Sequence, residues 1–570
     1  MTRGSDEHQA SGTSRADNQM RTPFSSSPQD PDQLDAHSLA QPAIVAKPPA
    51  TSQYGRRRFL LGLATGATAG LAAVHRLSAT PATARGPVTY EAFGAVGDGR
   101  TDDLPAIVAA HAFANDRGLT VRSRPDATYH LGRRALTAVI ATDTDWNTSR
   151  FIVDDTDVEN QRTSIFAARS LLAPISLRFS TLKRDQRRLE IAPPRDCWVR
   201  VENSRKRVYI RRGLNQNSGT AQRDCFVLRR DGSIEGDIDG DYAAITGIEA
   251  LPIDDQPLVL RGGVFTTIAN GAPAAKGYGY WSRNILISRS RTTVVGVTHH
   301  ITGEGETGQP YRGFLDASRC ADVTFRNCFV TGHKTYSTIG SAGKPVSMGT
   351  YDLNASEVVN FTLSGCRMDN ICDTSRWGVI GTNFCKNLLL EDCTLSRMDT
   401  HQGVSGTYTI RRCTLGHAGL NAIGRGVLTV EDSTIKGRSF LNLRMDYGST
   451  WEGTVVIRNC HWLPGCGAAV QPYLLNANND GRHDFGYPCF MPREITVDGL
   501  VIDDRHAPNG YKGPFLFSDP DGPQSESEAR PFSYSLTEKV TLNGVAVASG
   551  LPLRTSPDAA FAARVRVISL

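Results

Sequence analysis

The sequence predicts an all-β chain folded as a right-handed parallel β-helix, and three observations support this fold class. The first is a recurring setting for cysteine, at the end of "VTFRNC", "FTLSGC", "LLLEDC", "YTIRRC" and "VVIRNC". The second is spacing, because Cys393, Cys413 and Ser433 follow one another at intervals of 20 residues, close to the length of one β-helix coil. The third is the alternation of apolar residues before these positions, as in Tyr408 and Ile410, which is typical of short strands with one buried face.

Counting back from each landmark gives five segments that align without a gap, so one side of every coil has a constant length. These segments are residues 352–366, 379–393, 399–413, 419–433 and 446–460. The β-branched content and the absence of ten-residue helical patterns argue against a helical repeat. We therefore expect residues 263–505 to form the β-helix core.

The first 84 residues are predicted to form a disordered region followed by an export signal. Residues 1–55 are rich in Ser, Gln, Pro, Asp and Thr, a composition that favours disorder. Residues 56–84 place Arg56 and Arg57 before about 16 apolar residues and end in Ala-Thr-Ala. This segment resembles a twin-arginine signal and is short for a bilayer span. We expect a secreted or cell-surface protein, exported folded, with no membrane contact after signal cleavage.

Composition argues against a nucleic-acid partner. The chain is 39% hydrophobic and 21% charged, with a net charge of only +5 over 570 residues. Its one basic run within the body of the chain, "SRKRVYIRRG", carries a single aromatic residue, whereas nucleic-acid-binding surfaces combine many cations with stacking rings. The composition is that of an ordinary globular chain.

A capping segment is predicted in residues 85–135, which would also supply the first coil. The stretch "YEAFGAVGDGRTDDLPAIVAA" leads into an amphipathic helix expected from about Asp103 to Asn115, with Thr101 as its N-cap. Such a helix would cover the open end of the stack. Residues 136–262 are expected to hold early coils and an inserted β-rich segment of antiparallel strands, and residues 506–570 the last coils and a C-terminal cap.

This stretch, with the "TYHLG" that follows it, resembles the N-terminal cap of the pectate-lyase-like superfamily of parallel β-helix proteins. The superfamily includes polygalacturonase-type hydrolases, polysaccharide lyases and phage tailspike depolymerases. The resemblance covers residues 88–135 by motif and 284–505 by coil pattern. It implies a polysaccharide substrate, and a homo-oligomer is possible because tailspike-type β-helix proteins are often trimers.

The twelve cysteines are expected to begin reduced, because twin-arginine cargo folds before export. Their column reads as a ladder of small buried side chains. Disulfides and a metal site are the alternatives. No Cys-x-x-Cys pair accompanies the column, and His299 and His300 lie outside it. No metal or cofactor is predicted.

Three aspartates share the first position of the aligned segments on alternate coils: Asp352, Asp399 and Asp446. Alternate coils lie about 10 Å apart, near the roughly 6.5–9.5 Å between the carboxyl groups of inverting glycosidases. We therefore expect inverting hydrolysis by Asp399 with Asp446 or Asp352. His401 would tune the pKa of Asp399 or bind substrate. The alternative for each aspartate is a turn-capping role.

All variation in coil length precedes this position, so two short coils are flanked by coils with loops, which predicts a groove. Aromatic and charged side chains around it would suit a carbohydrate chain. The expected substrate-binding residues are His333, Lys334, Lys344, Asp373, Arg376, Trp377, His417, Arg425, Arg444, Tyr447 and Trp451.

The residues leave three functions open. The first is a glycoside hydrolase cleaving a polysaccharide. The second is a polysaccharide lyase, which needs a base and cations that neutralise a uronate. Such groups would come from Lys334, Lys344, Arg376, Arg425, His401 and Tyr447. The third is a non-catalytic glycan-binding protein.

Overall fold

The computed structural model describes residues 86–213, 218–273, 279–339, 345–377, 379–520 and 531–570. The predicted disordered region and export signal, residues 1–55 and 56–84, lie outside the described residues. Within the described part of the chain, no helix is both long and apolar enough to cross a membrane.

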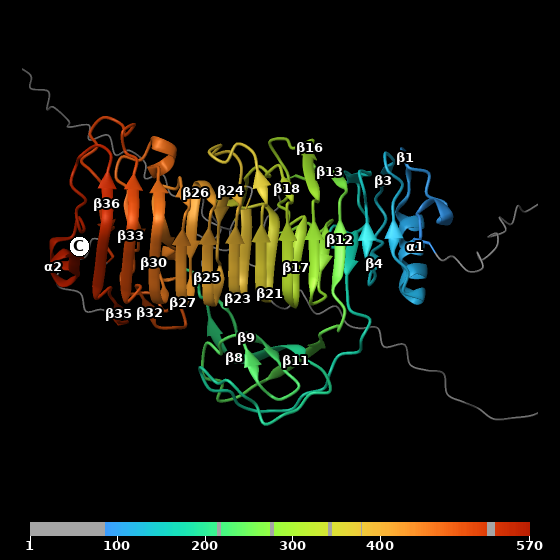
Figure 1. Cartoon of the computed structure of the whole chain (residues 1–570), viewed down its shortest axis with the longest axis horizontal. Helices are drawn as coiled ribbons and strands as arrows, with labels where there is room; N and C mark the ends of the chain where they lie inside the picture. Colours follow the sequence, from blue (N-terminus) through green and yellow to red (C-terminus); the bar gives the residue numbers. More distant parts are fainter. Residues whose placement is uncertain (1–85, 214–217, 274–278, 340–344, 378, 521–530) are drawn as a thin grey trace, which may run out of the picture.

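The predicted parallel β-helix is confirmed, as one network of 29 strands joined by parallel pairing (Figure 1). Its N-terminal part consists of β1 (Asp98–Asp102), β2 (Val121–Arg122), β3 (Thr128–Leu131), β4 (Ala138–Ile140), β5 (Thr144–Asp145), β6 (Arg150–Asp154), β7 (Phe166–Ala168), β12 (Leu258–Arg261), β13 (Val264–Ile268), β14 (Ile285–Ile287), β15 (Thr292–Val295), β16 (Thr298–Thr302), β17 (Leu315–Arg326) and β18 (Phe329–Val330). Its C-terminal part consists of β21 (Tyr351–Ser364), β22 (Arg367–Met368), β23 (Val379–Glu391), β24 (Thr394–Met398), β25 (Gln402–Arg411), β26 (Thr414–Ala422), β27 (Gly424–Glu431), β28 (Thr434–Ile435), β29 (Ser439–Leu443), β30 (Trp451–Trp462), β31 (Tyr473–Asn476), β33 (Glu494–Ile502), β34 (Phe515–Phe517), β36 (Lys539–Val547) and β37 (Arg566–Ser569).

Apolar side chains stack in columns inside the coils, as the alignment predicted. Phe361, Leu388, Tyr408, Leu428 and Val455 pair in turn across successive strands, and all five are buried. Alternate residues face outward along each strand. The repeat therefore forms one continuous hydrophobic core along the stack.

The cysteine column is confirmed as a ladder of buried free thiols, formed by Cys328, Cys366, Cys393, Cys413 and Cys460. The backbone N–H of Cys413 donates to Ser433 Oγ at 3.0 Å, so serine fills the same slot. One pair outside the column, Cys372 and Cys466, forms a disulfide, and the expectation that the cysteines begin reduced stays a prediction. Both lie outside the ladder, Cys372 in a turn and Cys466 in a 3-10 turn, η4 (Pro464–Gly467), and neither residue is buried.

Helix α1 (Leu104–Arg117) forms the N-terminal cap and packs on the first coils, and α2 (Ala559–Arg564) lies at the other end (Figure 1). Asp103 is the N-cap of α1 and makes no side-chain cap hydrogen bond. The predicted cap by Thr101 is wrong, because its hydroxyl donates to Asp98 Oδ2 at 3.0 Å. A 3-10 turn, η2 (Glu91–Phe93), precedes the helix.

The predicted β-rich insertion is a four-stranded antiparallel sheet that hangs from one side of the stack (Figure 1). It consists of β8 (Cys197–Val208), β9 (Thr220–Leu228), β10 (Ile234–Glu235) and β11 (Gly247–Pro252). Trp198 of β8 is fully buried against the stack, and its indole N–H donates to the Glu357 carbonyl at 2.9 Å. Two small pairs complete the described strands: β19 (Tyr336–Ile339) with β20 (Pro345–Met348), and β32 (Cys489–Phe490) with β35 (Tyr534–Ser535).

Candidate active site

Asp399 lies in the short connection between β24 and β25 and is fully buried. Its Oδ2 atom contacts the Arg397 guanidinium. It also lies 3.0 Å from His401 Nε2 and 3.2 Å from Arg444 Nη1. A buried carboxylate is costly unless it is paired and hydrogen-bonded, so this cationic surround is what makes the position tolerable.

The local sequence explains how these groups meet. Arg397 and Asp399 are two residues apart in extended chain and therefore point to the same side, whereas Met398 between them enters the hydrophobic core. The Arg397 guanidinium lies 4.1 Å from the centre of the Trp377 ring, a cation–π contact. His401 Nε2 lies 3.4 Å from the Tyr351 hydroxyl of β21.

Asp446 lies in a 3-10 turn, η3 (Met445–Tyr447), after β29. Its Oδ2 atom lies 2.8 Å from Arg444 Nη2 and 2.6 Å from Arg211 Nη2. One guanidinium, that of Arg444, thus contacts both Asp399 and Asp446. The two carboxylate oxygens are at most about 8 Å apart, because a single guanidinium fork spans them.

The backbone register corrects the predicted aspartate row. Val379 pairs with Arg397, not Asp399, and Arg397 pairs with Gly419. The ladder shifts between Leu395 and Arg397, so Asp399 lies two residues beyond the expected column. Asp446 lies outside the strands. The Arg444 side chain links its carboxylate to that of Asp399, and strand pairing does not.

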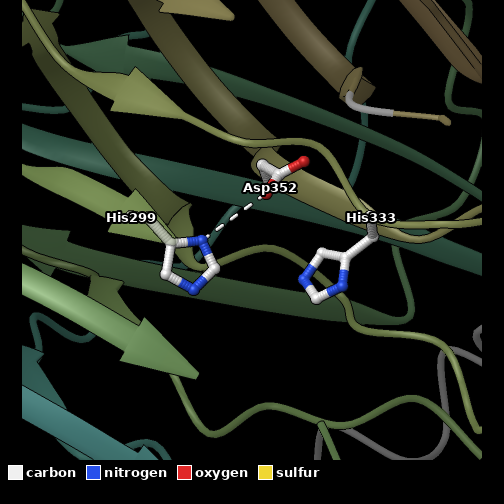
Figure 2. Close-up of side chains that lie close together, drawn as sticks. All are labelled: His299, His333 and Asp352. Atoms are coloured by element: carbon white, nitrogen blue, oxygen red, sulfur yellow. Dashed lines mark ion pairs between the residues drawn. The ribbon is translucent and has the colours of Figure 1, made fainter. Parts of the chain in front are cut away.

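Asp352 lies apart from this cluster, at a register shift in β21, and is fully buried. Its Oδ1 atom lies 3.5 Å from His299 Nδ1. Figure 2 shows His333 facing the same pair. Burial lowers the pKa of His299 to about 4, even though Asp352 acts to raise it. His333 was expected to bind substrate but is buried, with Nδ1 3.0 Å from Glu304 Oε1.

Three expected aromatic contacts, Trp377, Tyr447 and Trp451, are buried rather than open to a groove. Trp451 belongs to the hydrophobic core. The Tyr447 ring lies under two guanidiniums, with centroid distances of 5.2 Å to Arg211 and 5.1 Å to Arg444. The Trp377 and Tyr447 rings therefore position charged groups, the Trp451 ring packs in the core, and none of the three forms an exposed platform.

A second part of the expected groove is assembled from loops that remain partly exposed. Arg376 pairs with Asp373 at 3.5 Å, and the Arg376 carbonyl lies 3.1 Å from His417 Nε2. Burial lowers the pKa of His417 below its usual range. The backbone N–H of Lys334 donates to Glu304, and Lys344 lies outside the described residues.

Arg425 was expected on the groove floor, but it faces the inserted sheet. Its guanidinium lies 2.7 Å from Asp185 Oδ1 and donates to the Ile238 carbonyl at 3.1 Å. Arg425 therefore joins the insertion to the stack and lies away from the Asp399 cluster.

Sequence reasoning missed Arg211 and Tyr351. Arg211 comes from the basic run after β8 and is fully buried beside Asp446, and the Arg212 N–H donates to the Asp446 carbonyl at 2.9 Å. No period in the sequence connects the insertion to a coil more than 230 residues later. The only available signal was the density of arginines in "RVYIRRG".

A cavity of about 280 Å³ lies next to the Asp446 turn, and Phe485, Tyr487 and Phe532 contribute rings to its lining. The Tyr487 hydroxyl donates to the Tyr447 carbonyl at 2.8 Å, which fixes the cavity wall to η3. Asp484 and His483 also line the cavity, so it combines aromatic faces with hydrogen-bonding groups.

No family model matches the chain. One curated relative, a capsule KL64-specific depolymerase of Klebsiella phage P510, is 29% identical over 94 residues. This match covers 15% of the chain and spans only 9% of the relative's length.

Solved structures with a similar fold include tailspikes of two Pseudomonas phages. Tailspike gp61 of phage phi297 has a TM-score of 0.44 and 13% identity, covering 84% of this chain and 83% of its own. Tailspike gp49 of phage LKA1 has a TM-score of 0.43 and 14% identity, covering 84% of each chain.

Proposed function

We propose that this chain is an exported enzyme that hydrolyses a polysaccharide, with Asp399 and Asp446 as its two catalytic carboxyl groups. The observation that carries the proposal is the Arg444 guanidinium, which contacts both carboxylates and so holds them within reach of one glycosidic bond. Glycoside hydrolysis uses such a pair. The match to a capsule depolymerase supports a polysaccharide as the substrate class.

The two carboxyl groups differ in their surroundings, which suggests their roles. The Asp446 side chain is 16% exposed, so it is the group that activates water. Asp399 is buried, and its Oδ1 has no hydrogen-bond partner among the described residues. We assign it to protonate the leaving oxygen after the substrate has drawn the Arg444 guanidinium away, with His401 Nε2, 3.0 Å from Oδ2, passing it the proton.

Substrate entry requires Arg444 to move away from between the carboxylates and bind the sugar instead. The two oxygens lie no more than about 8 Å apart. This limit admits the roughly 6.5–9.5 Å of an inverting enzyme and the roughly 5 Å of a retaining one, so the anomeric configuration of the product decides between them. The partly exposed Asp373, Arg376 and His417 and the aromatic cavity beside η3 supply the polar and ring contacts that sugars need.

A lyase is the second candidate, favoured by the Tyr351 hydroxyl at 3.4 Å from His401 and by the neighbouring guanidiniums of Arg397 and Arg444. A base beside cations that neutralise a uronate carboxylate is what β-elimination requires. Its product carries a new double bond, whereas hydrolysis does not create one.

The test incubates the chain with neutral and acidic bacterial polysaccharides and measures reducing ends, ultraviolet absorbance and the anomeric configuration of the first product by NMR. Hydrolysis predicts reducing ends without absorbance, and an inverting mechanism predicts an inverted anomer. Absorbance would select the lyase. Glycan binding without any product would overturn both enzymatic proposals and leave a binding protein.

Matched variants localise the chemistry. Asp399→Asn and Asp446→Asn should both lower the rate of product formation by about 10³-fold while the far-ultraviolet circular dichroism is retained. Asp392→Asn is the control, because Asp392 is exposed and pairs with Arg412 on the outside of the stack. Equal loss in the control would refute the assignment of the site.

A further inference from the structure

Three metal-binding side chains converge inside the stack, at a place that the proposed hydrolysis does not use (Figure 2). His299 lies on β16, His333 follows β18, and Asp352 lies on β21. All three are buried, with exposures of 1%, 1% and 0%. Each offers one ligand atom, and these atoms lie within 4.8 Å of one another.

Both imidazoles are already held by their other ring nitrogen. His299 Nε2 lies 2.9 Å from Thr267 Oγ1, and His333 Nδ1 lies 3.0 Å from Glu304 Oε1. The other nitrogens, His299 Nδ1 and His333 Nε2, lie near the Asp352 carboxylate, where their lone pairs are available to a metal ion. Metal-binding histidines are characteristically oriented in this way, by an outer hydrogen bond to a carboxylate or hydroxyl.

Ring stacking fixes the planes of the two imidazoles. His299 stacks on Phe314 at 3.8 Å between centroids, with an interplanar angle of 3°. His333 stacks on Tyr311 at 4.7 Å and 14°. The two donor nitrogens are therefore preorganised rather than free to rotate toward other partners.

Asp352 lacks the compensation that a buried carboxylate requires. Among the described residues neither of its oxygens accepts a hydrogen bond, and His299 Nδ1 also has none. The Oδ1–Nδ1 distance of 3.5 Å is that of two donors on one ion rather than of a hydrogen bond. An uncompensated buried carboxylate destabilises the fold, and a bound cation would supply the missing compensation.

We propose that His299, His333 and Asp352 bind a divalent transition-metal ion, with Zn²⁺ as the favoured ion. Two nitrogens and one carboxylate oxygen suit Zn²⁺, Co²⁺ or Ni²⁺, whereas Ca²⁺ and Mg²⁺ prefer oxygen ligands. Ligand atoms on tetrahedral Zn²⁺ lie about 3.3 Å apart, so a pair of ligand atoms now up to 4.8 Å apart closes by at most about 1.5 Å when the ion binds.

Such an ion would tie three coils together beside the candidate active site. Tyr351 precedes Asp352 on β21 and contacts His401. The ion would therefore fix the strand that carries this tyrosine, and would also anchor the loop that carries His333. This role goes beyond hydrolysis and does not depend on it.

The test strips the full chain with EDTA and titrates it with ZnCl₂, CoCl₂ and, as a negative control, CaCl₂. We expect one Zn²⁺ per chain by calorimetry and elemental analysis, a higher unfolding temperature with Zn²⁺, and visible d–d absorption from bound Co²⁺. Failure of the wild-type chain to bind Zn²⁺ at micromolar concentration would overturn the proposal, whatever its polysaccharide activity.

Variants separate this site from adventitious binding. His299→Gln and Asp352→Asn should weaken Zn²⁺ binding at least about 100-fold, and Glu304→Gln, which removes only an outer partner, about 10–100-fold. His300→Gln is the matched control, because His300 is the exposed neighbour on the same strand and should bind Zn²⁺ as wild type does. If the ligand variants fail to fold, Glu304→Gln and the Co²⁺ spectrum of the wild type still decide the question. Undiminished binding in Glu304→Gln together with a Co²⁺ spectrum that lacks tetrahedral d–d bands would refute the site.

Discussion

The two ends of a single coil differ in how regularly their strands pair and in which side chains they bury. At the cysteine end, Thr394, Thr414, Thr434 and His461 pair in an unbroken series, each one residue after a ladder position. At the aspartate end, the register shifts just before Arg397, and charged side chains are buried. At the cysteine end, uniform apolar packing keeps the pairing regular. At the aspartate end the pairing is irregular, and burying the charged side chains there is energetically unfavourable unless they are paired.

The largest expected effect is on turnover. We expect Asp399→Asn to lower kcat by about 10³-fold, within the range for a lost general acid. Cys393→Ala, in the same coil, should leave kcat within about twofold, because the ladder touches no reacting group. Steady-state assays on a cleaved polysaccharide measure both variants. Comparable losses of kcat would contradict the division between the two ends.

The next effect is on stability. Arg444→Met removes the cation shared by Asp399 and Asp446 and leaves a buried carboxylate with less compensation. We expect it to lower the free energy of unfolding by about 3–5 kcal/mol, as measured by urea denaturation. Arg412→Met is the control, since the Arg412 side chain is 46% exposed and a surface pair contributes about 0–1 kcal/mol.

A third prediction uses a buried histidine that lacks a charged partner. Burial lowers the pKa of His111 in α1 to about 3, and its Nε2 lies 3.0 Å from the Tyr90 hydroxyl. The unfolded chain binds this proton near pH 6.5 and the folded chain does not, so stability falls as pH drops from about 6.5 toward 3. The contribution at pH 5 is about 2 kcal/mol.

Thermal unfolding of His111→Gln and of the wild type at pH 7 and pH 5 checks this expectation. The variant should lose less stability between the two pH values. An identical loss would mean that His111 is protonated in the folded chain.

The smallest effect concerns the ladder itself. Cys413→Ala removes one buried sulfur and should cost roughly 1–2 kcal/mol through the cavity that it leaves, measured by urea denaturation. Cys413→Ser should cost about the same or more, because it places a hydroxyl among apolar atoms. A neutral result for both would mean that the coils close over the missing atom.

The fold was predictable because the residues that define it repeat. Tyr408, Leu428 and Val455 recur at one position in each aligned segment, and the structure pairs them as the alignment implied. The site was predictable only in part. Asp399, His401 and Arg444 meet as a cluster, but a local shift of two residues at Arg397 leaves no trace in the sequence spacing.

Other contacts could not be predicted from the sequence repeat. Arg211 reaches Asp446 from the inserted sheet, and the sequence contains no repeat that relates the two. Tryptophan is a residue type that stacks on sugar rings, but Trp451 lies at the start of β30, where its side chain points into the hydrophobic core. His299 was set aside because it lies outside the cysteine column, although its partners are on neighbouring coils.

The coexistence of one disulfide with ten unpaired cysteines has a consequence for thiol exchange within the molecule. Thiol exchange requires one sulfur to reach another, and all ten unpaired thiols are buried. Such sulfurs are out of reach of oxidants and of exposed disulfides. The molecule can therefore carry an oxidised bond across 94 residues without scrambling it, and its reduced interior survives for as long as the coils stay closed.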